Sequence, residues 1–306
     1  MSNVISRPKR KANRGKMYNR GDWKYALPAF IPLVLLSVVP LSQAIWTAFT
    51  DQVAGFNVKI KFIGFGNFRR LLTDSMFWAS FKIGTIWAVS VTLLALVLGF
   101  GLALLLNQKL RFLGLMRVLS LVPWAMPPVI VAIMWNLLLR PTSGPIDQVL
   151  TTLHLPGAGI DFLGDFNTAF PTVILIGAWV AMPIITVSVL AAIQGIPSEM
   201  VEAATIDGAN AWQRFRFITV PAVRAITSAL VALNIIWQFS SFGLVYVLTA
   251  GGPGGKTFVP ALFAYNEAFK YGNFGYAASM GVVMALAIVL MLGVYLKASK
   301  REDVQR

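Results

Sequence analysis

The sequence contains no cysteine and only one histidine, His154, among its 306 residues. The missing cysteines exclude disulfide frameworks, thiolate metal sites and cysteine nucleophiles. One histidine without neighbouring ligands cannot form a histidine-rich metal site, so we interpret His154 as an ordinary loop residue. Charged residues are also scarce, at 12% of the chain. Soluble domains carry about 25% charged residues, so this composition argues against a water-soluble surface.

The sequence is rich in long apolar runs, and 57% of the residues are hydrophobic. A membrane-spanning helix needs about 20 mainly apolar residues. Six runs meet this requirement, at residues 26–49, 83–106, 118–139, 170–193, 226–248 and 277–296. We therefore expect an all-α fold, a polytopic bundle of six transmembrane helices that occupies residues 26–296. The first run exceeds the roughly 7–15 apolar residues of a signal peptide, so we expect it to be a span.

None of the six runs contains Asp, Glu, Lys, Arg or His. Proton-coupled transporters and pumps use ionisable residues inside the membrane. The sequence therefore argues against ion-coupled transport by this chain alone, and any driving energy has to come from another component.

The distribution of basic residues predicts the orientation in the membrane. Of the 26 lysines and arginines, 18 lie on the side that holds both chain ends, whereas the acidic residues divide equally between the sides. Because cytoplasmic loops carry the excess of Lys and Arg, we expect cytoplasmic tails at 1–25 and 297–306. A basic run beside a first span is typical of a topology signal or a lipid-headgroup contact, so we expect no nucleic-acid partner.

Two proline and glycine patterns have local consequences. The pair Pro127-Pro128 should break or kink the third run, because proline removes a backbone donor and clashes with the preceding turn. Residues 250–257 end like a phosphate-binding loop, but Ala250 stands where that motif requires its first glycine. We interpret this segment as a tight external turn.

The loop at 194–221 has helical signals of its own. Ser198 is a candidate N-cap of a first short helix, and Gly208 suits the left-handed residue that ends it. Asn210 can cap a second helix, which Pro221 should end. Trp212, Phe215 and Ile218 would then share one face of that second helix. The pattern alone fits docking to a partner and packing on the chain's own bundle equally well.

Glu202-Ala203-Ala204, Gly208, Ile218 and Pro221 resemble the "EAA" loop of the membrane subunits of binding-protein-dependent ABC importers. Val220 stands where leucine is usual. The resemblance implies that this loop couples to an ATP-binding subunit. The implied contact residues are Glu202, Ala203, Ala204, Asp207 and Gly208.

Most of the chain shares the resemblance. Phe65-Gly66-Asn67-Phe68 and Gly251-Gly252-Pro253 are similar to segments of sugar permeases of the maltose-transporter class, in particular its first permease subunit. The resemblance implies a prokaryotic plasma-membrane protein without a cofactor of its own. Its implied partners are a second permease, two ATP-binding cassette subunits that hold ATP and Mg²⁺, an extracytoplasmic solute-binding protein, membrane lipid and a carbohydrate.

A substrate site is expected midway through the bundle. Pro183 should deform the fourth run beside Trp179, and the fifth run carries several polar groups that need partners inside a membrane. Sugar hydroxyls could supply those partners; the alternative is bonding between helices, which we favour for Asn234. Six positions resemble the sugar-contacting residues of the maltose permease: Val180, Ala181, Ile184, Trp237, Gln238 and Ser241. Their side chains differ, which predicts a different sugar.

Two other classes of function remain as alternatives. An ATP-independent channel or facilitator would not need a structured docking loop. A membrane-embedded enzyme would need nucleophiles, bases or metal ligands near the helices, and the runs lack them. We therefore assign no catalytic and no metal-binding residue.

Overall fold

The computed structural model describes residues 28, 30–32, 34–55, 59–108 and 111–304. Within these residues the regular secondary structure is helical, and the one β-bridge joins Thr50 to Phe62. The chain forms two compact units, Met1–Trp46 and Thr47–Arg306. In the first unit the described segment forms the π-helical turn η1 (Val34–Val38) and then α2 (Val39–Ala48), which ends just inside the second unit. The basic tail at 1–25 lies outside the described residues.

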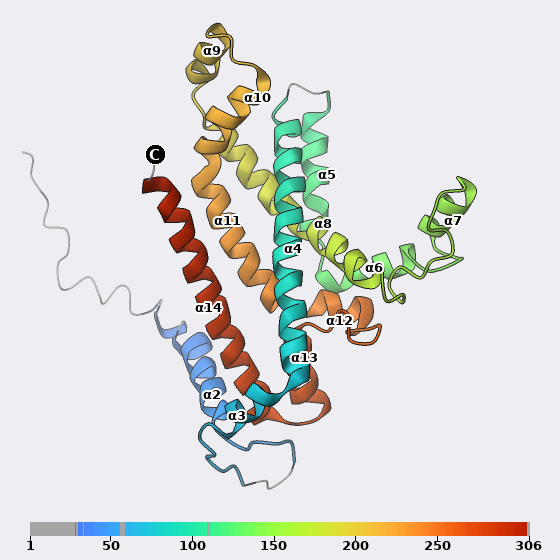
Figure 1. Ribbon diagram of the computed structural model, residues 1–306, viewed down its shortest axis with the longest axis vertical. Helices are drawn as coiled ribbons and strands as arrows, with labels where there is room; N and C mark the ends of the chain where they lie inside the picture. The colour runs from blue at the N-terminus through green and yellow to red at the C-terminus, as the bar shows by residue number, and fades with distance from the viewer. Residues whose placement is uncertain (1–27, 29, 33, 56–58, 109–110, 305–306) are drawn as a thin grey trace, which may run out of the picture. The chain divides into compact units, whose positions relative to one another are not determined.

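The second unit contains all the other elements (Figure 1). In chain order these are α3 (Gly66–Thr73), α4 (Ser75–Leu106), α5 (Leu113–Ala125), α6 (Pro128–Leu138), α7 (Pro145–Thr152), α8 (Ala169–Gln194), α9 (Ser198–Ile206), α10 (Ala211–Arg214), η2 (Phe215–Thr219), α11 (Val220–Ser240), α12 (Gly243–Thr249), α13 (Pro260–Tyr265), η3 (Asn266–Lys270) and α14 (Phe274–Val304).

Five helical stretches are long and apolar enough to cross a membrane, and a bent pair of helices can supply a sixth span. The five are Phe30–Ala48, Ser75–Leu106, Ala169–Gln194, Ala211–Ser240 and Phe274–Tyr295. The bent pair is α5 with α6, whose axes differ in direction by 99°. The all-α membrane fold expected from the sequence is thus confirmed, with five helices long and apolar enough to span a membrane, or six if the bent pair counts as one span.

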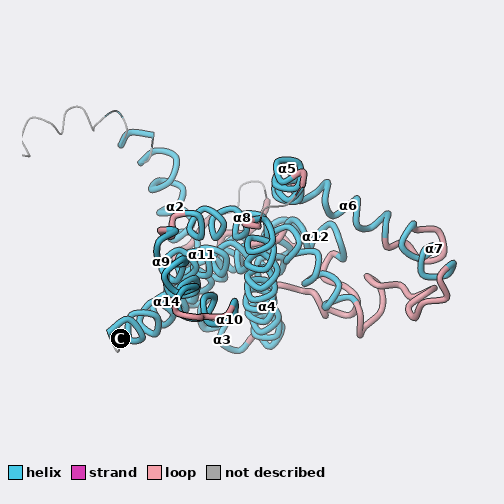
Figure 2. The backbone as a smooth tube through the Cα atoms, turned by 90° about the horizontal axis from the view of Figure 1, so that it is seen from above, coloured by secondary structure: helices cyan, strands magenta, loops and turns pink. Residues whose placement is uncertain are grey.

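The core forms where α4 packs against α8, the most extensive helix contact of this unit. Glycine permits the close approach at two levels. A Cβ on Gly177 would lie 2.5 Å from the ring of Trp87, and one on Gly99 would lie 2.9 Å from the main-chain oxygen of Met182. Both helices are apolar around their circumference, as expected for spans that face protein and lipid. Seen from above, α6 and α7 extend away from this core (Figure 2).

The expected break at Pro127-Pro128 is confirmed, because α5 ends at Ala125 and α6 starts at Pro128. A second break was not predicted. The fifth run ends as a regular helix at Ser240, and Ser241 adopts an extended conformation with ψ 126° before α12 begins. The sixth run also differs from expectation, since α14 continues past residue 296 to Val304.

Candidate functional site

The loop at 194–221 folds into two short helices at the end of the second unit opposite α3 (Figure 1). The first, α9, contains no buried residue, and Ile206 at its end is 86% exposed. Ser198 is not its N-cap, contrary to expectation. Pro197 occupies that position and no side chain caps the helix. Proline with its fixed φ begins the helix here because the first N–H groups of a helix lack internal partners anyway.

Gly208 ends α9 with φ at +81°, the left-handed conformation expected of it. The Ala209 N–H donates to the Ala204 carbonyl across 2.9 Å and closes the turn. A Cβ at Gly208 would meet no atom within 4 Å. The requirement for glycine therefore comes from the backbone conformation and not from crowding.

Asn210 caps the second helix, as expected. Its Oδ1 accepts from the Gln213 N–H at 2.9 Å, and the Gln213 side chain accepts from the Asn210 N–H at 2.7 Å. This reciprocal pair is a capping box, which satisfies two donors that the helix end would leave free. The direction of the chain after the Gly208 turn is therefore well defined.

Pro221 does not end this second helix, which corrects the sequence-based expectation. Residues Ala211–Ser240 form one helical stretch through α10, η2 and α11. The π-helical turn η2 lies immediately before Pro221. Its wider hydrogen-bond spacing accommodates a residue without an N–H, whose ring would clash in a regular helix. The second helix of the 194–221 loop and the fifth apolar run are therefore parts of one continuous helical stretch.

The aromatic face expected on this helix is only partly directed at the bundle. Phe215 packs edge-on against Phe100 of α4, with ring centroids 5.8 Å apart. Trp212 contacts Phe215 at 5.4 Å but remains 67% exposed. Phe215, the first residue of η2, thus packs on the chain's own bundle, while Trp212 of α10 remains mostly exposed.

The candidate coupling residues divide between two faces of α9. Ser198, Val201 and Glu202 line a groove of about 820 Å³ between α9, the ends of α4 and α8, and the α10 and η2 segments. Ala203 and Asp207 do not line this groove and are exposed. At helical spacing these two residues point away from Ser198, on a face that they share with the exposed Met200.

The candidate substrate residues on α8 lie on an unbroken helix. Val180 and Ile184 are half-buried and Ala181 is buried. The expected deformation at Pro183 does not interrupt α8, which runs regularly from Ala169 to Gln194. Trp179, one residue before this set, packs edge-on against Trp135 of α6 with centroids 5.6 Å apart.

The candidate substrate residues on the fifth run lie at the end of α11, which contacts α8. Trp237 is 51% exposed, whereas Gln238 and Ser241 are half-buried. The Gln238 carbonyl accepts from the Trp87 Nε1–H at 3.0 Å and from the Ser241 N–H at 3.1 Å. Ser241 therefore belongs to the break after the helix and not to its regular surface.

Among the described residues, Asn234 does not bond a neighbouring helix, contrary to the sequence-based interpretation. It is fully buried, and its Nδ2 donates at 3.2 Å to the Leu230 carbonyl of its own helix. Its Oδ1 has no hydrogen-bond partner among the described residues. A buried acceptor without a partner is costly, so Asn234 leaves a polar position open inside the bundle.

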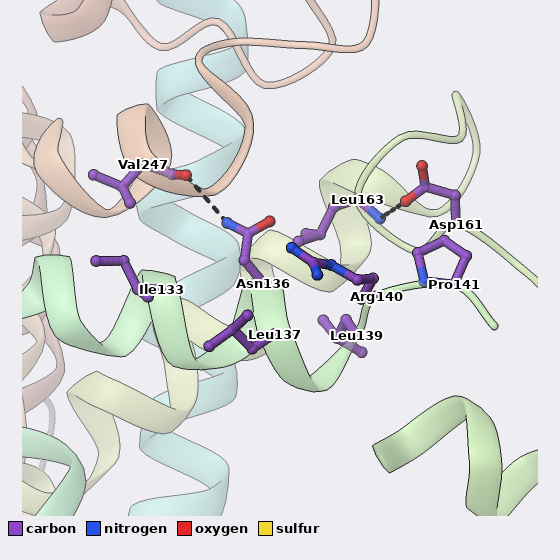
Figure 3. A pocket seen from close by; sticks show the side chains of 9 residues that line it. All are labelled: Ile133, Asn136, Leu137, Leu139, Arg140, Pro141, Asp161, Leu163 and Val247. Carbon is purple, nitrogen blue, oxygen red and sulfur yellow. Dashed lines mark hydrogen bonds between the residues drawn. The ribbon is translucent and has the colours of Figure 1, made fainter. Parts of the chain in front are cut away.

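The structure also reveals a pocket that the sequence analysis missed (Figure 3). It encloses about 440 Å³ between α6, α12 and the segment after α7, and Asn136, Arg140 and Asp161 supply its polar groups. The Asn136 Nδ2 donates to the Val247 carbonyl at 3.1 Å and so ties α6 to α12. A signal was present in the sequence, because Asn136 is the only amide side chain of the third apolar run.

The segment 250–257 is a tight turn, as the sequence analysis proposed. The Thr257 hydroxyl lies 2.6 Å from that of Thr249 and donates to the Gly252 carbonyl at 2.8 Å. Thr257 is fully buried, and the turn follows α12 instead of a strand. A phosphate-binding loop joins a strand to a helix and presents its hydroxyl to a metal ion, so this segment has neither property.

Comparisons with known proteins give a consistent result. The family described as "Binding-protein-dependent transport system inner membrane component" matches residues 95–302. The trehalose/maltose transport system permease protein MalF of Thermococcus litoralis is 30% identical over 274 residues, covering 90% of this chain and 92% of the relative. The sulfoquinovosyl glycerol transport system permease protein SmoG of Agrobacterium fabrum is 30% identical over 281 residues, covering 90% and 89%.

Solved structures agree in fold. A chain of a bacterial ABC transporter involved in the import of the acidic polysaccharide alginate superposes with a TM-score of 0.78 at 22% identity, covering 92% of this chain and 96% of that one. A second structure, of the bacterial alginate ABC transporter in complex with an alginate pentasaccharide-bound periplasmic protein, gives a TM-score of 0.77 at the same identity.

Proposed function

Since the chain belongs to the family of binding-protein-dependent transport system inner membrane components, we propose that it is one permease subunit of an ATP-driven importer for a di- or oligosaccharide or a related carbohydrate. Family membership makes the chain a multi-pass membrane permease and not an enzyme. The relatives named for trehalose/maltose and for sulfoquinovosyl glycerol support a carbohydrate substrate.

The observation that carries the coupling role is the exposed helix α9 with its Gly208 turn. A short helix without a single buried residue contributes little to its own fold, and it exposes the apolar side chains of Met200 and Ile206 beside Ala203. Such a face fits into a groove of a partner protein. We assign that partner as an ATP-binding cassette subunit, which supplies ATP and Mg²⁺; this chain contributes no cofactor of its own.

The continuous helix from Ala211 to Ser240 suggests how a movement of α9 reaches the substrate. About 40 Å of helix separate Ala211 from Gln238, at 1.5 Å per residue. When ATP closes a pair of cassette subunits, displacement of α9 would tilt this helix as a lever. Its far end carries Trp237 and Gln238, so the residues proposed to contact the sugar would move with it.

A complete importer needs further subunits. A second, similar permease would form the other half of the pathway, and two cassette subunits would bind the two coupling loops. A solute-binding protein would deliver the sugar to the extracytoplasmic side. The pocket around Asn136, Arg140 and Asp161 lies between α6, α12 and the segment after α7 (Figure 3).

Both termini are proposed to be cytoplasmic, on the same side as α9. The absence of cysteine makes the orientation easy to test, because single cysteines can be introduced without background. Ile206→Cys should react with a membrane-impermeant maleimide only after the cells are opened, whereas Lys256→Cys should react in intact cells. The reverse pattern would overturn the orientation.

The function is tested by purifying the tagged chain from its native membrane and assaying the complex in vesicles. Retention of an ATP-binding cassette subunit together with ATP-dependent uptake of a labelled disaccharide would support an importer. Uptake that is equally fast without ATP would identify a facilitator instead. Chemical conversion of the sugar by the isolated chain would identify an enzyme.

A further inference from the structure

Four of the eight basic residues on the proposed outer side lie within twelve residues of each other, namely Lys59, Lys61, Arg69 and Arg70. This concentration opposes the general bias of basic residues toward the cytoplasm. Lys59, Lys61 and Arg69 are exposed, and none of them forms an ion pair within the described residues. Arg70 is already engaged, since its guanidinium stacks 3.8 Å from the centre of the Tyr276 ring. These three cations therefore have no ion-pair partner among the described residues, although the Asp51 Oδ1 accepts from the main-chain N–H of Lys61 at 2.6 Å.

These cations lie on and beside α3, a strongly amphipathic helix. Its inner face is held by Leu71, which is buried, and by Asn67, whose Nδ2 donates to the carbonyls of Ala48 and Thr50 at 3.0 and 2.8 Å. Its outer face carries Arg69 together with Leu72, which is 68% exposed. One face of the helix is therefore fixed to the protein, and the other combines a cation with apolar surface.

A cluster of phenylalanines continues this apolar surface. Phe65 lies 5.4 Å from Phe49 and 5.7 Å from Phe68, measured between ring centroids, and it is 73% exposed. Amphipathic helices that lie in the membrane interface present phenylalanine and leucine on the face that enters the membrane. The cluster therefore resembles an anchor more than a core.

The position of α3 relative to the spans places it at that interface. Asp74 follows α3 directly and caps α4, accepting from the N–H groups of Met76 and Phe77 at 2.9 and 3.1 Å. The same carboxylate accepts a hydrogen bond from the Tyr276 hydroxyl near the start of α14. The helix thus lies where two apolar spans begin, at the end of α4 opposite α9 (Figure 1).

We propose that Lys59, Lys61, Phe65, Arg69 and Leu72 form an outer-leaflet patch that binds the phosphate groups of anionic phospholipids. The three cations pair with headgroup phosphates, while the phenylalanine and leucine side chains enter the upper acyl region. Lipid is the occupant that fits, because unpaired cations beside exposed apolar side chains at an interface match the charge and polarity profile of an anionic lipid. A second permease would have to present negative charge and apolar surface side by side to match the same patch.

The assembled transporter provides the test. It is purified in nanodiscs of phosphatidylcholine that contain a minor fraction of phosphatidylglycerol, and retained lipids are counted by native mass spectrometry. The test variant combines Lys59→Gln, Lys61→Gln and Arg69→Gln. The control variant combines Lys82→Gln, Lys256→Gln and Lys270→Gln, which removes the same charge from exposed positions outside the patch. Thermal unfolding of both complexes verifies that they are folded.

The wild type and the control should retain phosphatidylglycerol in preference to phosphatidylcholine. The test variant should lose that preference by about fivefold for each charge removed, as expected for cations near a charged bilayer. Equal retention by all three proteins would overturn the proposal. Dissociation of the second permease from the test variant would identify a protein interface instead. Displacement of the lipid by soluble glycerol phosphate at comparable concentration would show that a free phosphate suffices and would overturn the membrane assignment.

Discussion

Trp87 on α4 donates its indole N–H to the main-chain oxygen of Gln238 on α11, across 3.0 Å. The bond joins residues 151 positions apart at the level where α11 ends. A helix end leaves its last carbonyls without internal partners, and in a membrane such groups must be satisfied by protein. Trp87 therefore helps to stabilise the break that separates α11 from α12.

Replacing Trp87 with phenylalanine should destabilise the assembled permease, because the ring position is retained but the donor is lost. Losing a buried hydrogen bond costs about 1–3 kcal/mol. The midpoint of thermal unfolding of the detergent-solubilised complex reports the change. Trp124→Phe, at an exposed position of α5, serves as the control and should leave the midpoint unchanged. Equal midpoints for Trp87→Phe and the control would show that the bond contributes nothing.

Gly177→Ala should destabilise the contact between α4 and α8. The added methyl group would lie 2.5 Å from the Trp87 ring, which is itself fully buried and cannot move freely. Overpacking of this kind costs about 1–3 kcal/mol. Gly101→Ala is a matched control on α4, since its methyl group would meet nothing within 4 Å. Unfolding in denaturant should separate the two variants; similar stability would mean that the helices can move apart at this level.

Much of this fold follows from the composition of the chain. The expected run at 170–193 coincides with α8 to within one residue at each end. Apolar length and proline pairs are strong signals, and they located the spans and the break before Pro128. The break at Ser241 has no such signal, because serine and phenylalanine are tolerated in helices. It depends on a partner, Trp87, that is distant in sequence.

Gly208→Val should reduce coupling between ATP hydrolysis and transport without unfolding the bundle. A β-branched residue in the left-handed conformation costs more than the roughly 1–2 kcal/mol of an ordinary side chain, so the turn after α9 should change direction. Gly208→Asn is the matched control, because asparagine adopts this conformation more readily. We expect substrate-stimulated ATPase activity to fall in the valine variant and to be largely retained with asparagine. Normal stimulation and uptake in Gly208→Val would remove the basis for this role.

The candidate coupling residues differ in how far the sequence could predict their structure. The turn at Gly208 and the cap at Asn210 could be predicted, because each depends only on local backbone chemistry. Pro221 was wrongly expected to end the helix. The helix continues from Ala211 to Ser240, and the π-helical turn that precedes Pro221 has no signal in the local sequence. The division of Glu202 and Ala203 between the groove and the free face depends on how α9 lies against α4 and α8.

Gln238→Ala should weaken sugar transport while leaving the fold intact. Trp87 bonds to the main-chain oxygen of Gln238, so truncating the side chain does not remove that bond. The lost amide would deprive a bound sugar of one hydrogen-bonding partner, which corresponds to about 1–3 kcal/mol and a roughly 5–150-fold higher KM for uptake.

Trp237→Ala should have a similar effect on KM through loss of a stacking surface, and its half-exposed ring predicts little cost in stability. Basal ATPase activity and subunit assembly should stay near the wild-type level in both variants. Ser228→Ala, at a half-buried position nearer the start of α11 whose hydroxyl bonds its own helix at 2.9 Å, provides the control. If uptake by Gln238→Ala and Trp237→Ala matches that of the control, the sugar is bound elsewhere, and the second permease becomes the place to look.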